Sequence, residues 1–177
     1  MDTAEALVIS RLNWSLFGTL TFLARDEGIS SLRQRKAFFA WVRDLSKFFS
    51  VKSSSLHWVL RMERGETFGK EHLHCLIGAP LGSSNPGQRF WLMDRWEKLG
   101  NGMSRLFEYD SSLSGVGYTC KCLGMERTSS GGTSYELNKF GSADELILSH
   151  AAEWSLRKMA RSRDGLKLYG GDLCRRR

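Results

Sequence analysis

Two histidines separated by one residue, His72 and His74, are the side chains in this sequence best placed to do chemistry together. They lie in the segment EHLHCLIG, residues 71–78, whose composition predicts a β-strand. Because side chains alternate along a strand, both imidazoles would point to one face, and Cys75 would point to the other. Two imidazoles on one rigid face can bind a metal ion, although a bare His-x-His more often lies on a solvated surface.

A carboxylate from the preceding segment can complete such a metal site. Residues 56–63 also read as a strand, and the polar stretch that follows them predicts a hairpin turn back to the histidine strand. The hairpin would place Glu63 opposite His72, and in the same register Arg61 lies opposite His74. This register gathers the apolar residues of both strands on the other face, as a buried core requires. Two imidazoles and one carboxylate with open coordination positions suit Mg²⁺, Mn²⁺ or a similar divalent ion.

Tyr118 and Lys121 form a second constellation, in the segment GVGYTCKCLG. A helix over 112–123 would place both side chains on one face, because they are three residues apart. A tyrosine with a pKa of about 10 is a weak nucleophile. A metal ion that polarises a phosphate would make it easier to attack, so that a weak nucleophile suffices, and a lysine would stabilise the negative charge that develops. Taken alone, this spacing is a weak signal, since a half-buried tyrosine beside a surface lysine is common.

Helices and strands that would position these residues can be read from the periodicity of apolar side chains. Amphipathic spacing and serine caps predict helices, with Ser30 or Ser31 beginning one of them and Ser142 the last. Short β-favouring runs predict strands in adjacent hairpins. The expected helices cover 4–12, 31–49, 87–99, 112–123 and 142–161, and the expected strands cover 14–23, 56–63, 71–78 and 104–109. Together they predict an α+β sandwich, a largely antiparallel sheet covered by helices.

The charge of the chain favours a polyanionic partner. Its 177 residues include 26 Lys and Arg against 19 Asp and Glu, which gives a formal net charge of +7. Phosphate contacts made by such an excess release counterions, so nucleic acid is the expected ligand class. No apolar run approaches the roughly 20 residues that a membrane span needs, so no membrane partner is expected.

The cysteines predict a reducing compartment. None of the four, Cys75, Cys120, Cys122 and Cys174, forms a CxxC pair, and the first residues lack the basic region of a secretory signal. A cytoplasmic location with reduced thiols is therefore expected. A structural zinc site is a weaker alternative, because Cys75 alternates away from the two histidines.

Three short segments occur in an order that resembles a known family. FGTLTF at 17–22, HLHCLIG at 72–78 and YTCK at 118–121 resemble the three motifs of HUH endonucleases, specifically the rolling-circle replication initiators, or Rep proteins. The resemblance covers about residues 14–123. It implies a ferredoxin-like or RRM-like antiparallel sheet flanked by helices, within a single HUH endonuclease domain over 1–177 whose C-terminal helix and basic tail occupy 142–177.

The resemblance also implies roles for the residues that match the motifs. Glu63, His72 and His74 would bind the divalent ion, Tyr118 would be the nucleophile, and Lys121 would be the motif lysine. The implied reaction nicks and rejoins single-stranded DNA through a 5′-phosphotyrosine link and initiates rolling-circle replication of a plasmid or phage. An origin hairpin and the host replication helicase and polymerase are the implied partners.

Departures from the family pattern leave alternatives open. No GxxxxGK helicase motif is present, and no second tyrosine stands beside Tyr118. The pattern is therefore that of a single-tyrosine enzyme, in which a homodimer could complete strand transfer, and single-tyrosine HUH transposases or relaxases share it. Two further alternatives are a non-catalytic RRM-like nucleic-acid-binding protein and a metal-dependent hydrolase that uses water.

Four more residues are expected to contact DNA. Arg61 is the strongest of them, because it shares a face with the metal site. His57 shares that face too, but lies about 20 Å along the strand from Glu63 and cannot reach the same ion. Thr19 and Thr21 belong to the first motif, FGTLTF.

Overall fold

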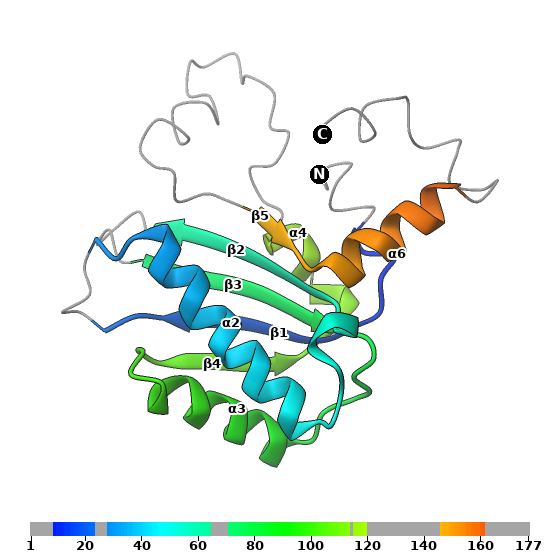
Figure 1. The fold of residues 1–177 in the computed structure, drawn as a ribbon. Coiled ribbons are helices and arrows are strands. Elements are labelled where there is room, and N and C mark those ends of the chain that lie inside the picture. The colour runs from blue at the N-terminus through cyan, green and yellow to red at the C-terminus, as the bar shows by residue number, and fades with distance from the viewer. Residues whose placement is uncertain (1–8, 24–27, 65–70, 114, 120–145, 162–177) are drawn as a thin grey trace, which may run out of the picture.

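A computed structural model describes residues 9–23, 28–64, 71–113, 115–119 and 146–161 of the chain (Figure 1). The described elements follow one another in an alternation of strands and helices. In chain order they are β1 (Trp14–Thr21), α2 (Ser31–Phe48), the 3₁₀ turn η2 (Ser53–Ser55), β2 (Trp58–Arg64), β3 (Glu71–Gly78), α3 (Pro86–Lys98), β4 (Ser104–Glu108), the 3₁₀ turn η3 (Ser111–Leu113), α4 (Gly115–Thr119), β5 (Leu146–Leu148) and α6 (His150–Arg161).

The strands form one antiparallel sheet with the order β4-β1-β3-β2-β5. The first four strands and the two helices between them follow the β-α-β-β-α-β order of a ferredoxin-like fold. β5 adds a short fifth strand beside β2. The predicted α+β class, with an antiparallel sheet flanked by helices, is therefore confirmed.

One face of the sheet is buried beneath α2 and α3 (Figure 1). α2 presents Phe38 and Trp41 to this face and α3 presents Trp96, all three without solvent exposure. The Trp41 indole donates a hydrogen bond of 2.9 Å to the Leu92 carbonyl, which ties the two helices together while satisfying a buried polar group. None of the helices in the described ranges is long and apolar enough to cross a membrane.

The opposite face of the sheet is divided into an apolar and a polar part. Val59 and Leu76 are fully buried in a second apolar cluster, which Val116 of α4 and Ala152 of α6 join. Figure 1 shows α6 at the end of the sheet where β3 finishes. The polar part of the face lies toward the start of β3, where His72 is located.

Polar side chains cap the N-termini of α2 and α3. Ser30 is the N-cap of α2, and its hydroxyl accepts a hydrogen bond from the Arg33 amide. Asn85 is the N-cap of α3, in a capping box with Gln88, whose side chain accepts a hydrogen bond from the Asn85 amide. The prediction of Ser30 as a cap is confirmed, and α3 begins at Pro86, one residue earlier than expected.

The prediction of one helix over 142–161 is wrong in its first part. Leu146–Leu148 form β5, and the helix begins only at His150; Ser142 lies outside the described residues. The apolar run of β5 pairs with the edge of β2, so that tertiary pairing outweighs the local preference for a helix. Ser149 follows β5 and caps α6, because its hydroxyl accepts a hydrogen bond from the Ala152 amide.

Two other predicted helices are described only in part. Over 112–123 the chain forms η3 and then α4 instead of one continuous helix, and residues 120–123 lie outside the described range. Over 4–12, Ile9 is helical and residues 10–12 form a turn and a bend, while residues 4–8 lie outside it.

The Ser149 hydroxyl also accepts a hydrogen bond of 3.1 Å from the Trp58 amide, and so joins α6 to β2. We expect Ser149→Ala to lower the free energy of unfolding by about 1–2 kcal/mol, because a helix cap is lost and a buried amide loses its acceptor. Urea unfolding followed by circular dichroism measures this loss. Ser54→Ala, at an exposed serine in η2, is the control and should change the free energy by less than about 0.5 kcal/mol; equal losses in both variants would contradict the assignment.

Candidate metal centre

The pairing of β2 with β3 brings three potential metal ligands to one face of the sheet. Glu63 pairs with His72, and Arg61 pairs with His74. This register is the predicted one. Since directly opposed residues on antiparallel strands point to the same side, the carboxylate and both imidazoles share the polar part of the face.

Distances between the three side chains fit a shared cation. Glu63 Oε2 lies 3.2 Å from His74 Nε2 and 3.8 Å from His72 Nε2. One potential ligand atom from each residue can be chosen so that all lie within 4.8 Å of one another. Two ligands of a cation with bonds of about 2.1 Å lie about 3 to 4.2 Å apart, so small side-chain rotations would complete the set. Glu63, His72 and His74 could therefore hold a metal ion.

Solvent reaches this group chiefly at His72. His74 is 3% exposed and Glu63 is 9% exposed, whereas the side chain of His72 keeps 20% of its surface accessible. The two imidazole rings stand nearly perpendicular, at 86°, with centroids 4.8 Å apart. A cation held here would have protein ligands on the sheet side and room for further ligands toward solvent, as a catalytic metal site requires.

Thr19 of β1 fixes the orientation of His74. Its hydroxyl lies 3.1 Å from His74 Nδ1, while Nε2 of the same ring faces Glu63. A cation at Nε2 requires the proton on Nδ1, and Thr19 Oγ1 can accept the hydrogen bond which that proton donates. The Phe17 ring stacks parallel to His74, with the ring centroids 6.2 Å apart. The imidazole is therefore held by a hydrogen bond at one nitrogen and by a ring on one face.

Arg61 is buried beside the ligands. It is 3% exposed, and its Nε lies 3.9 Å from Glu63 Oε2. An isolated carboxylate would be costly at this depth, and the guanidinium balances its charge. The DNA contact predicted for Arg61 stays a prediction; in the structure this side chain belongs to the electrostatic support of Glu63.

The two other predicted DNA-contacting residues lie at opposite ends of the sheet. Thr21, the last residue of β1, pairs with His72 across the sheet, and its hydroxyl donates a hydrogen bond to the Met103 carbonyl. His57 precedes β2 at its other end, where its Nε2 lies 3.0 Å from the Ser155 hydroxyl of α6. Burial lowers the pKa of His57, which favours the neutral imidazole. The structure therefore places Thr21 beside the cluster and His57 away from it.

Cys75 points into the core, as alternation along β3 predicts. Burial raises the pKa of its thiol to about 12, and the side chain packs with the apolar residues beneath α2 and α3. A thiol that remains protonated is a poor metal ligand. Cys120, Cys122 and Cys174 lie outside the described residues.

The segment that carries Tyr118 lies on the same face as the metal ligands. Tyr118 is in α4, which packs against β3. Gly115 begins α4 so close to Phe17 that a Cβ there would lie 3.5 Å from its ring, and this ring stacks on His74. Gly115, Phe17 and His74 thus lie in succession on this face of the sheet. Lys121 lies outside the described residues.

Comparisons of the chain with models of known protein families, with curated proteins and with solved structures find no match. The chemistry of the site therefore has to be inferred from its own side chains and their surroundings.

Metal binding can be tested at His72, the most accessible ligand. At one hundred times its dissociation constant, an ion that binds only the folded chain stabilises it by about 2.7 kcal/mol, which raises the melting temperature by about 5–10 °C. We expect Mn²⁺ to give this shift with the wild type and no shift with His72→Ala. His150→Ala, at an exposed histidine of α6, is the control and should keep the full shift; a shift retained by His72→Ala would exclude this site.

The supporting role of Thr19 predicts a smaller effect. Thr19→Val removes the hydrogen-bond acceptor and keeps the shape of the side chain, so we expect the affinity for Mn²⁺ to fall about 10- to 100-fold. Isothermal titration calorimetry measures the affinity. Thr21→Val should leave it unchanged, because Thr21 lies opposite His72 but its hydroxyl donates to the Met103 carbonyl. A Thr19→Val variant of undiminished affinity would show that the hydroxyl does not orient His74.

Proposed function

We propose that this protein is a metal-dependent endonuclease that nicks and rejoins single-stranded DNA, with Tyr118 as the nucleophile. The observation that carries the proposal is the cluster of Glu63, His72 and His74 on the face of the sheet against which α4 packs. Metal ligands and a tyrosine-bearing helix then meet on one surface. The net charge of +7 supports a polyanionic substrate.

The proposed ion is Mg²⁺ or Mn²⁺. Two imidazoles and one carboxylate offer mixed nitrogen and oxygen ligands, which suit ions of this kind. Cys75, the one cysteine among the described residues, is turned into the core, so this part of the chain adds no thiolate to them. A divalent ion bound here would supply a Lewis acid that polarises a phosphate oxygen.

The proposed reaction is a transesterification at phosphorus. The Tyr118 phenol oxygen forms a bond to the phosphorus, the bond from phosphorus to the 3′-oxygen breaks, and the phenol proton ends on the released 3′-hydroxyl. A 5′-phosphotyrosine link remains. Lys121 stabilises the negative charge that develops on the phosphate. Attack by a 3′-hydroxyl reverses these changes and reseals the strand, so no nucleoside triphosphate is consumed.

Initiation of rolling-circle replication in a plasmid or phage is the proposed setting. A free 3′-hydroxyl primes synthesis by a host polymerase, and an origin hairpin would present the single strand to the site. A homodimer would supply the second tyrosine needed for strand transfer. Single-tyrosine transposases and relaxases of the HUH superfamily use the same chemistry, so they are the alternative settings for this site.

Two alternatives from other classes make different predictions. A non-catalytic RRM-like binder would use stacking aromatics on its open face without a metal ion, whereas this face carries Glu63, His72 and His74 beside its aromatic rings. A metal-dependent hydrolase would use water and leave no protein–DNA adduct. The adduct is therefore the discriminating product.

Covalent trapping tests the nucleophile. Labelled single-stranded oligonucleotides of randomised sequence, including stem-loops, are incubated with the protein and Mn²⁺ and resolved on a denaturing gel. We expect a covalent band that disappears with a chelator and in Tyr118→Phe.

Tyr109 provides the matched control for this experiment. It also lines the face near α4, but burial, together with the negative charge of Asp110, raises the pKa of its phenol and makes it a poorer nucleophile. Tyr109→Phe should keep the band. Cleavage without a band would indicate the hydrolase, and binding without cleavage by a protein that binds Mn²⁺ would favour the RRM-like binder.

A further inference from the structure

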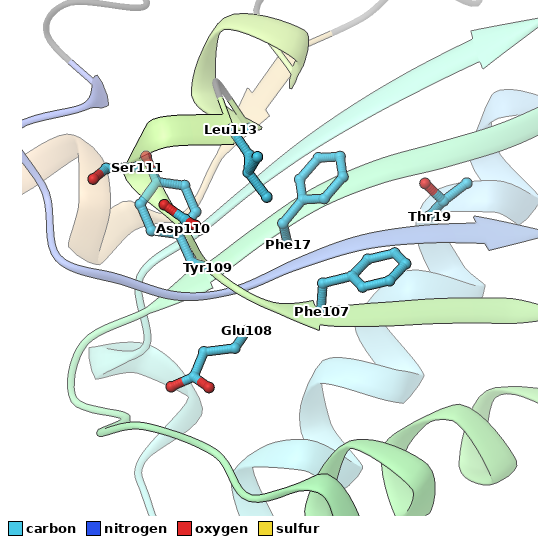
Figure 2. Close-up of a pocket in the computed structure, with 9 residues that line it drawn as sticks. Phe17, Thr19, Phe107, Glu108, Tyr109, Asp110, Ser111 and Leu113 are labelled. Atoms are coloured by element: carbon cyan, nitrogen blue, oxygen red, sulfur yellow. The ribbon is translucent and has the colours of Figure 1, made fainter.

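A hollow of about 950 Å³ lies beside the metal centre, between the edge strand β4 and the turn η3 (Figure 2). Its volume is in the range of about 300–1,000 Å³ that is common for small-ligand sites. Thr19 lines it, and the same hydroxyl contacts His74. The hollow and the metal centre therefore share a wall, although nothing in the proposed reaction at phosphorus uses the hollow.

Aromatic rings form the floor of this hollow. Phe107 of β4 lies directly opposite Phe17 of β1, so both rings rise from the same face of the sheet. Phe107 is 57% exposed, and Leu113 of η3 is 76% exposed. Figure 2 shows the two rings and Leu113 on the same side of β4. A flat apolar ligand could bury part of this surface by stacking on Phe107.

The charges around the hollow favour an uncharged, hydrogen-bond-donating ligand over a phosphate. None of the described residues that line it is basic. Glu108 is turned away from the rings, and its carboxylate lies 3.7 Å from Arg89. Asp110 remains as the acidic group of the hollow; two hydrogen bonds from Ser112 reach its Oδ1, so its Oδ2 can accept a bond from a ligand.

Positive charge lies outside the hollow, on the same face. Arg105 is exposed on β4, directly opposite Thr19 and two residues before Phe107. From β4 inward, Arg105, Thr19 and His74 form one row across the sheet. A strand whose phosphate lies at His74 can thus meet a cation at Arg105 and an aromatic surface at Phe107.

We propose that this hollow binds one unpaired nucleobase of the DNA strand whose phosphate lies at the metal centre, and that it prefers bases with an exocyclic amino group. The base stacks on Phe107, and its amino group donates a hydrogen bond to Asp110. The proposal rests on the proposed function for the identity of the strand. It adds a site that selects the sequence next to the cleaved bond.

Stacking is tested by fluorescence anisotropy with the full chain, a chelator and short labelled oligodeoxycytidine. We expect Phe107→Ala to lower the affinity about tenfold and Phe107→Trp to retain it. Phe90→Ala is the matched control, because Phe90 is 66% exposed on α3, which covers the other face. An abasic oligomer of the same length should bind the wild type and Phe107→Ala equally.

Base selection is tested with oligodeoxyuridine, which differs from oligodeoxycytidine in carrying a keto group in place of the amino group. We expect the wild type to prefer the cytidine oligomer about fivefold. Asp110→Asn keeps an oxygen for Ser112 and replaces the other by a donor, so the preference should be lost. Equal binding of both oligomers by the wild type would overturn the selection of amino-bearing bases.

These outcomes separate the nucleobase site from the proposed reaction. Because the assay contains no metal and measures no cleavage, Phe107-dependent binding would support the site even if covalent trapping failed. Unchanged binding in Phe107→Ala, or an equal loss with the abasic oligomer, would overturn the site even if the tyrosine adduct formed.

Discussion

The chemistry proposed for this protein depends on the pairing of β3 between β1 and β2. β3 buries Leu73, Cys75 and Ile77 under α2 and α3, and this burial forces His72 and His74 to the other face. A slip of one residue would expose the core and bury both imidazoles, so the apolar side holds the polar side in register. The metal site therefore needs no dedicated loop, since the energy that fixes its geometry comes from the core beneath it.

The strands on either side of β3 then add supporting contacts to the site. β2 supplies Glu63 together with Arg61, whose charge makes a buried carboxylate tolerable. β1 supplies Thr19, which orients His74, and Phe17, which packs on its ring. β1 and β3 are hydrogen-bonded on both sides, and β2 is paired with β3 along its whole length. The relative positions of these side chains therefore vary little, and rigid placement is what a metal site demands.

Part of this arrangement could be predicted from the sequence. The predictable contacts lie within one hairpin, and the others join strands that are far apart in the chain. Alternation and a local hairpin were enough to predict that Glu63 lies opposite His72, because both depend on residues close together in the chain. Thr19 was expected to touch DNA, and its contact with His74 depends on the pairing of β1 with β3, which residues far apart in the chain create. Phe17 and Phe107 become a pair only through the same kind of non-local pairing. The sequence of 142–161 predicts one helix, but Leu146–Leu148 pair with the edge of β2, which residues far apart in the chain bring together. Tyr118 and Lys121 were assigned through resemblance, and only the backbone of Tyr118 in α4 can be compared with that expectation.

The three residues of β5 have a further consequence for the sheet as a whole. An unpaired strand edge invites other chains to add to it, and proteins protect such edges by covering or shortening them. β5 pairs with Val59, Leu60 and Arg61 and so covers the part of the β2 edge that includes the apolar Val59 and Leu60. The opposite edge belongs to β4, which has five residues and carries the charges of Arg105 and Glu108. The short β5 on one side and the charged β4 on the other both disfavour growth of an intermolecular sheet from the described strands.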